Sequence, residues 1–168
     1  MSNINEVKEF IITRTLKAPC TLVFKMWSQA EHLKNWWGPA GSAIEVVTLD
    51  FRTNGVFHYK MKSLHDSFGI FKFRHIDEPN SITWVNSFAN EKGEIIKPPF
   101  KDLDFPKEIL NTVTFSEKDG VTTLTITAKP LNATENEIST FYSLTESMQQ
   151  GYGGTLDQLD NYLSSITK

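Results

Sequence analysis

The sequence contains a single cysteine, Cys20, in 168 residues, so neither a disulfide framework nor a zinc site of several thiolates can form within the chain. Its charges nearly balance, with 17 Lys and Arg against 20 Asp and Glu, which excludes the basic surface that nucleic acids attract. No apolar run approaches the roughly 20 residues of a membrane-spanning helix. The opening residues MSNINEVKEF lack the basic start and apolar core of a secretory signal. We therefore expect a cytoplasmic protein that binds no nucleic acid and does not insert into a membrane.

The usual motifs of metal, phosphate and nucleotide sites are also missing. The sequence has no H-E-x-x-H, G-x-S-x-G, P-loop or dinucleotide-binding glycine motif. Its four histidines are scattered along the chain, at His32, His58, His65 and His75. We assign no catalytic residue and no metal ligand, and we expect no cofactor.

Aromatic residues are abundant, with 12 Phe, 4 Trp and 4 Tyr, and most of them fall in strand-like segments. Alternating apolar and polar residues, rich in β-branched and aromatic types, predict strands. We predict strands at residues 7–16, 43–51, 56–62, 69–76, 81–88, 109–116 and 121–129. Two short helices are predicted around residues 22–27 and 30–37, and a long loop at 89–106.

The last segment, Thr134 to Ile166, predicts one long helix. Thr134 and Glu137 have the spacing of a capping box, in which each side chain bonds the other's free backbone amide. Apolar residues then recur three and four positions apart up to Ile166, which is typical of a helix that packs on a core. Glycines at 151, 153 and 154 interrupt this stripe, and they suggest either a bend or a very close neighbouring surface.

The two periodicities together predict an aromatic site between the sheet and this helix. Alternation places His58 opposite Phe57, where we expect it in solvent, and it places His75 on the same face as Phe73. The predicted ligand-binding residues are a floor of Phe57, Tyr59, Phe71, Phe73 and Trp84, a roof of Met148 and Tyr152, and Trp37 near one end. The same rings could instead fill the volume as a closed core.

Several short runs together resemble a known family. They are Ala18-Pro19, Trp36-Trp37-Gly38-Pro39, Leu49-Asp50-Phe51-Arg52 before Gly55, Gly69-Ile70-Phe71, and Gly151-Tyr152 to Thr155-Leu156-Asp157-Gln158-Leu159. With these residues the chain resembles the activator of heat-shock-protein ATPase homologue (AHSA-like) domain of the START-like, or SRPBCC, superfamily. The resemblance implies an α+β helix-grip fold: a curved seven-stranded antiparallel sheet, in the order β-αα-β6-α, wrapped around a C-terminal helix with a ligand cavity between them.

Three functions fit this scaffold. The leading hypothesis is non-enzymatic binding of a small apolar ligand, lipid-like or aromatic. The alternatives are an enzyme such as a polyketide cyclase or hydrolase, and a co-chaperone-like module that contacts a chaperone partner. We expect one domain over residues 1–168, as a monomer or homodimer.

We predict that protein purified without a histidine tag contains no stoichiometric transition metal, because one cysteine and scattered histidines form no recognisable ligand set. Elemental analysis checks this. A melting temperature that rises reproducibly with ATP or NAD would contradict the parallel expectation of no nucleotide site, since a ligand bound to the native state stabilises it.

Overall fold

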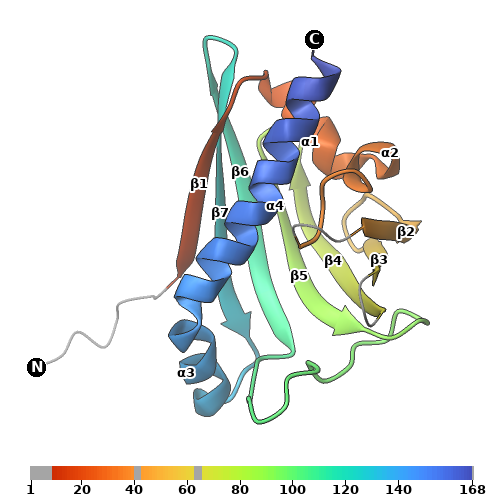
Figure 1. Cartoon of the computed structure of the whole chain (residues 1–168), viewed down its shortest axis with the longest axis vertical. Coiled ribbons are helices and arrows are strands. Elements are labelled where there is room, and N and C mark those ends of the chain that lie inside the picture. Colours follow the sequence, from red (N-terminus) through yellow and green to blue (C-terminus); the bar gives the residue numbers. More distant parts are fainter. Residues whose placement is uncertain (1–8, 40–42, 63–65, 168) are drawn as a thin grey trace, which may run out of the picture.

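The computed structural model describes residues 9–39, 43–62 and 66–167. Within these residues, seven antiparallel strands form one curved sheet in the order β1-β7-β6-β5-β4-β3-β2, and the C-terminal helix crosses its concave face (Figure 1). The strands are β1 (Phe10–Leu16), β2 (Ala43–Leu49), β3 (Val56–Lys62), β4 (Ser67–Asp77), β5 (Ser81–Ala89), β6 (Glu108–Lys118) and β7 (Val121–Leu131). The helices are α1 (Cys20–Ser28), α2 (Ala30–Leu33), α3 (Glu135–Ser143) and α4 (Thr145–Ile166). The predicted α+β helix-grip architecture is confirmed.

Element boundaries differ from the predicted ones by a few residues. The predicted first strand starts at residue 7, outside the described residues, whereas β1 starts at Phe10. The second short helix ends at Leu33 and continues as turns up to Trp36. The predicted loop at 89–106 is present between β5 and β6, with one isolated bridge between Ala89 and Ile95.

The alternating residues of the strands point into the core as predicted. The inward side chains of β4 and β5 include Phe71, Phe73, Ile82 and Trp84, each at most 3% exposed. Antiparallel pairing sets Phe71 opposite Phe57 of β3, and neighbouring side chains on the same face pack across the strands. The concave face is therefore mainly aromatic and aliphatic.

The prediction for His75 is wrong, because β4 carries a β-bulge. Phe73 pairs with Trp84, but the next pair in the ladder is His75 with Thr83, so Arg74 is the extra residue. An inserted residue reverses the alternation beyond it. His75 is consequently exposed on the outer face, and Ile76 takes the inward position beside Ile82.

The prediction for His58 is also wrong. It lies on the outer face of β3 as expected, but its side chain is only 5% exposed because the turn after β5 covers it. Its Nε2 lies 3.0 Å from the carbonyl oxygen of Asn90, and its ring lies against Phe68. A carbonyl only accepts hydrogen bonds, so Nε2 is the protonated ring nitrogen in this contact.

The C-terminal segment forms two helices instead of the single helix predicted from its apolar stripe. The capping box of Thr134 and Glu137 is present at the start of α3. The helix breaks at Leu144, whose φ of −104° and ψ of 14° are not helical, and α4 follows at once. The glycines lie inside α4, and a Cβ at Gly151 or Gly153 would meet nothing within 4 Å. No close surface therefore requires a glycine at either position.

The second half of α4 supplies the main contacts between the helix and the sheet. Leu156, Leu159 and Leu163 are at most 3% exposed and belong to the large core cluster. A smaller cluster around Phe141 of α3 covers the other end of β1, β6 and β7. Among the described helices, none combines the length and the hydropathy of a membrane span.

We predict that Leu156→Ala lowers the free energy of unfolding by about 2–5 kcal/mol, because it empties a fully buried site between α4 and the sheet. Chemical denaturation measures this value. The control is Ile166→Ala on the same helix, whose side chain is 40% exposed and which should change stability by roughly 0.5 kcal/mol. Equal effects of the two substitutions would contradict the assignment of this helix face to the core.

Candidate functional site

A cavity of about 460 Å³ lies between the sheet, the first half of α4 and the loop that joins β5 to β6. Its volume falls in the usual range for small-molecule sites. Its lining residues are mostly apolar: Trp37, Gly38, Pro39, Tyr59, Met61, Asn86, Phe100, Leu103, Phe105, Leu144, Ser147, Met148, Gly151, Tyr152 and Thr155.

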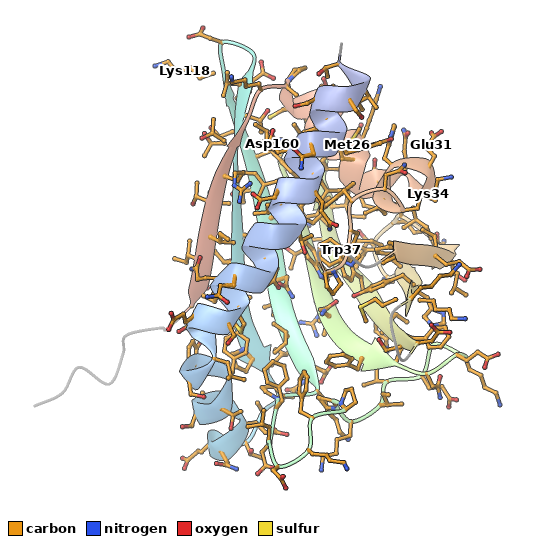
Figure 2. The ribbon with its side chains drawn as sticks, viewed as in Figure 1. Met26, Glu31, Lys34, Trp37, Lys118 and Asp160 are labelled. Atoms are coloured by element: carbon orange, nitrogen blue, oxygen red, sulfur yellow. The ribbon has the colours of Figure 1, made fainter. Side chains whose placement is uncertain are left out.

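The segment after α2 forms one wall of this cavity and is tied to α4. The carbonyl oxygen of Gly38 accepts hydrogen bonds from the Thr155 hydroxyl (2.8 Å) and from Nε2 of Gln158 (2.9 Å). Gln158 also donates to the carbonyl of Trp36. Gly38 has a φ of +105°, a conformation that residues with a Cβ rarely adopt. These contacts hold Trp37 beside α4, where its ring meets Tyr59 of β3 and Phe71 of β4 (Figure 2).

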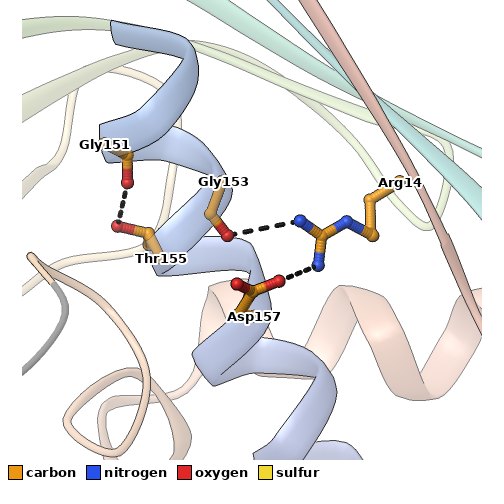
Figure 3. Close-up of polar contacts among 5 residues, drawn as sticks. All are labelled: Arg14, Gly151, Gly153, Thr155 and Asp157. Atoms are coloured by element: carbon orange, nitrogen blue, oxygen red, sulfur yellow. Dashed lines mark hydrogen bonds and ion pairs between the residues drawn. The ribbon is translucent and has the colours of Figure 1, made fainter. Parts of the chain in front are cut away.

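The opposite side of α4 is attached to β1. Figure 3 shows the Arg14 guanidinium between two acceptors, the Asp157 carboxylate at 2.7 Å and the carbonyl oxygen of Gly153 at 3.2 Å. The same view shows the Thr155 hydroxyl near the carbonyl oxygen of Gly151, one turn earlier. The helix is thus attached on both flanks at the level of the cavity, which fixes the position of the residues that line it.

Trp37 is held by other rings. It meets Phe71 edge to face, with ring centroids 5.0 Å apart and planes at 90°, and it also contacts Trp27 and Trp36. Aromatic pairs with this geometry add to the stability that burial provides. Trp37 is nevertheless only partly buried, because it borders the cavity.

Tyr59 lies on the floor of the cavity, directly over Gly69 of the neighbouring strand. A Cβ at Gly69 would come within 2.4 Å of the Tyr59 ring and hydroxyl, so only glycine permits this close approach. Burial raises the pKa of Tyr59 to about 12, and a hydrogen bond donated by Trp37 opposes this shift. Tyr59 therefore presents a neutral phenol at physiological pH.

Tyr152 connects α4 to a buried amide on the sheet. Its hydroxyl donates to Oδ1 of Asn111 at 2.7 Å, and Asn111 is fully buried. Nδ2 of Asn111 donates in turn to the carbonyl of Ile109. Burial is the main cause that raises the pKa of Tyr152, and the neighbouring Tyr59 adds to it. This second phenol also stays neutral.

Asn86 is the polar side chain of the lining whose hydrogen bonding is incomplete. It lies on the inward face of β5, opposite Phe71 of β4. Its Oδ1 is shielded from solvent and accepts no hydrogen bond from the described residues. A buried acceptor without a donor is unfavourable by about 1–3 kcal/mol. Asn86 lines the cavity while its Oδ1 is out of reach of solvent, so a ligand could donate a hydrogen bond to this oxygen once the amide rotates about its last side-chain bond.

The lining contains no charged side chain among the described residues. It has no His, Asp, Glu, Lys, Arg or Cys, and its two phenols are neutral. No group of three or more His, Cys, Asp or Glu that could hold a metal ion occurs in the described part of the chain. The cavity as built can enclose and hydrogen-bond a molecule, but it offers no acid or base that titrates near neutral pH.

Comparison with known proteins identifies the family to which this chain belongs. Residues 17–164 match the family model described as "Activator of Hsp90 ATPase homolog 1-like protein". The chain belongs to this family. A search of curated proteins found no match.

Solved structures similar to this member of the Hsp90-activator-homolog family share its fold. A Staphylococcus epidermidis protein is 25% identical with a TM-score of 0.76, and the match covers 98% of this chain and 95% of that chain. Protein Ms6760 from Mycobacterium smegmatis is 25% identical with a TM-score of 0.73, covering 92% and 90%. DynU16, from the dynemicin biosynthetic locus, is 13% identical with a TM-score of 0.63, and the match covers 94% of this chain but 48% of that chain.

The structure divides the predicted site residues of this family member into two groups. Trp37, Tyr59, Met148 and Tyr152 come together around the cavity. The other four lie outside the lining, packed in the core with at most 3% exposure: Phe57, Phe71, Phe73 and Trp84. Phe71 and Trp84 stack with ring centroids 4.6 Å apart, and this stack fills the space beneath the cavity.

Sequence reasoning missed the two asparagines and the loop residues of the site. Asn86 and Asn111 each occupy an inward position of a strand, where the alternation predicts an apolar residue. A polar residue at such a position is a signal that the sequence alone displays. The loop residues Phe100, Leu103 and Phe105 have no such periodicity, so only the folded chain places them at the cavity.

We predict that Tyr59→Phe reduces the loss of stability at alkaline pH. Between pH 10 and 12 the unfolded wild type releases a proton that the folded protein retains, so the free energy of unfolding falls as the pH rises. Removing this group should make the decline over that interval smaller by roughly 2–3 kcal/mol. Urea unfolding at pH 8 to 12 measures both proteins, and parallel curves would contradict the raised pKa.

Proposed function

We propose that this protein binds a small, predominantly apolar molecule in the cavity between the sheet and α4, without transforming it. The observation that carries the proposal is the cavity itself: about 460 Å³, open to solvent on one side and lined by aromatic and aliphatic side chains with a few hydroxyl and amide groups. Apolar walls with a few polar groups are typical of small-molecule sites. Trp37, Tyr59, Met148 and Tyr152 are the proposed contacts, and the four core rings support them.

The character of the lining supports binding over catalysis. General acid–base catalysis uses a group that exchanges a proton near the working pH. Tyr59, with its pKa raised to about 12, does not. The hydroxyl of Tyr152 is committed to Asn111 and that of Thr155 to Gly38. The lining therefore provides an apolar surface of defined shape and few reactive groups.

The loop between β5 and β6 provides an apolar entrance. Phe100 and Leu103 line the cavity and are also 40% and 41% exposed, so each faces both the interior and the solvent. Phe100 contacts Phe105, which in turn contacts Phe141 of α3. An apolar ligand that enters here meets apolar surface along its path.

The proposal is tested by titrating the protein with N-phenyl-1-naphthylamine, an uncharged probe whose fluorescence rises in apolar surroundings. We expect saturable binding, and we expect Gly151→Leu to weaken it by roughly tenfold or more, a change of about 1.4 kcal/mol. The reason is that Gly151 lines the cavity and has open space around its Cβ, so a leucine extends into the volume that the probe needs.

Gly153→Leu is the matched control. It places the same residue on the same helix, also where a Cβ meets nothing within 4 Å, but outside the lining. Both substitutions raise helix propensity equally. Probe binding that is absent from the wild type, or weakened equally by the two leucines, would contradict a ligand site in this cavity.

A further inference from the structure

We infer that the cavity selects uncharged ligands that carry a hydroxyl group, and that Asn86 is the residue that determines this specificity. The inference rests on the proposed function and narrows it to a class of ligand. Two independent features of the lining lead to it: the absence of a charged partner among the described residues, and one amide whose oxygen lacks a donor.

A charged ligand group would find no counter-ion inside the cavity. Arg14, the cation on the β1 side of α4, is bonded to the Asp157 carboxylate and the Gly153 carbonyl. On β3, Lys60 pairs with Asp66 and lies over the Phe68 ring. Burial of a carboxylate or ammonium group without an opposite charge is strongly unfavourable. A ligand that enters fully must therefore be neutral.

The polar groups of the lining are mostly satisfied by the protein. The Tyr152 hydroxyl donates to Asn111, the Thr155 hydroxyl donates to Gly38, and Tyr59 accepts a hydrogen bond from Trp37. Oδ1 of Asn86 has no donor among the described residues. A ligand gains most from hydrogen bonding at Asn86, because there it removes an existing deficit and displaces no internal bond.

The chemistry of an amide favours a hydroxyl over other polar groups. Rotation about the last side-chain bond of Asn86 turns either its oxygen or its NH₂ toward the cavity, and this torsion is soft. A hydroxyl both donates and accepts, so it matches either orientation, whereas an ether oxygen only accepts. Asn86 stands opposite Phe71 and near the aromatic walls, so a hydroxyl on an aromatic body fits the surroundings.

The test is a calorimetric titration of the wild-type protein at pH 7 with four probes of one ring system. They are 2-naphthol, 2-methoxynaphthalene, naphthalene and 2-naphthoate. We expect 2-naphthol to bind about tenfold more tightly than naphthalene or the methyl ether, the ratio that 1.4 kcal/mol gives. We expect 2-naphthoate to bind at least as weakly as naphthalene, because its carboxylate has no partner.

Asn86→Leu, which keeps a similar volume, should remove the preference. Binding of 2-naphthol should fall to the level of naphthalene, while naphthalene itself binds as before or more tightly. Asn161→Leu is the control, since Asn161 is exposed on α4 and is not part of the lining, and it should leave all four affinities unchanged. If the Asn86 variant does not fold, the four-probe series on the wild type still decides whether the cavity prefers a neutral ligand with a hydroxyl group.

The possible failures are distinguishable. If N-phenyl-1-naphthylamine binds but 2-naphthol shows no advantage over its methyl ether, the ligand site stands and the hydroxyl inference is wrong. If 2-naphthoate binds as tightly as 2-naphthol, charge is not excluded, and the inference is likewise wrong. If no probe binds at all, N-phenyl-1-naphthylamine included, the proposed function itself fails.

Discussion

The contact between α4 and the concave face of the sheet is the interaction on which the rest of this structure depends. Leu156, Leu159 and Leu163 cover rings that would otherwise form a large exposed apolar patch, which soluble proteins rarely tolerate. Hydrogen bonds to Gly38 on one side of the helix and to Arg14 on the other then hold it in place across the sheet. These contacts position α4 and the segment that carries Trp37, which form two walls of the cavity.

The cavity follows from how unevenly α4 meets the sheet. Its second half packs tightly through leucines, whereas the first half carries Gly151, which has no side chain to fill the space beside it and lines the cavity. The break at Leu144 directs α3 to a separate cluster around Phe141. The unfilled volume therefore lies between two apolar clusters, with Trp37 on one side of it and the loop that carries Phe105 on another.

The chain has the helix-grip fold and belongs to the Hsp90-activator-homolog family. One fold supports many functions, so the function must be inferred from the residues of the site. Here the site is a neutral, largely apolar cavity. Its phenols are held protonated by burial, and its polar groups mostly bond one another. Because hydrogen bonds inside such a cavity are worth more than in water, one unsatisfied amide at Asn86 has a disproportionate influence on which molecules fit.

The sequence by itself determined the seven strands, the start of the C-terminal helical segment and most of the inward faces, because alternation, capping and turn signals are local and survive without tertiary contacts. The capping box at Thr134 and the inward Phe71 and Trp84 are examples. Only the tertiary structure decided that Trp84 fills the core while Tyr59 borders a cavity, and that a bulge turns His75 outward. The physical reason is that empty volume and strand register depend on side chains far apart in the sequence. Whether twenty aromatic rings close a core or leave a site is settled by the fit between segments, which no local pattern records.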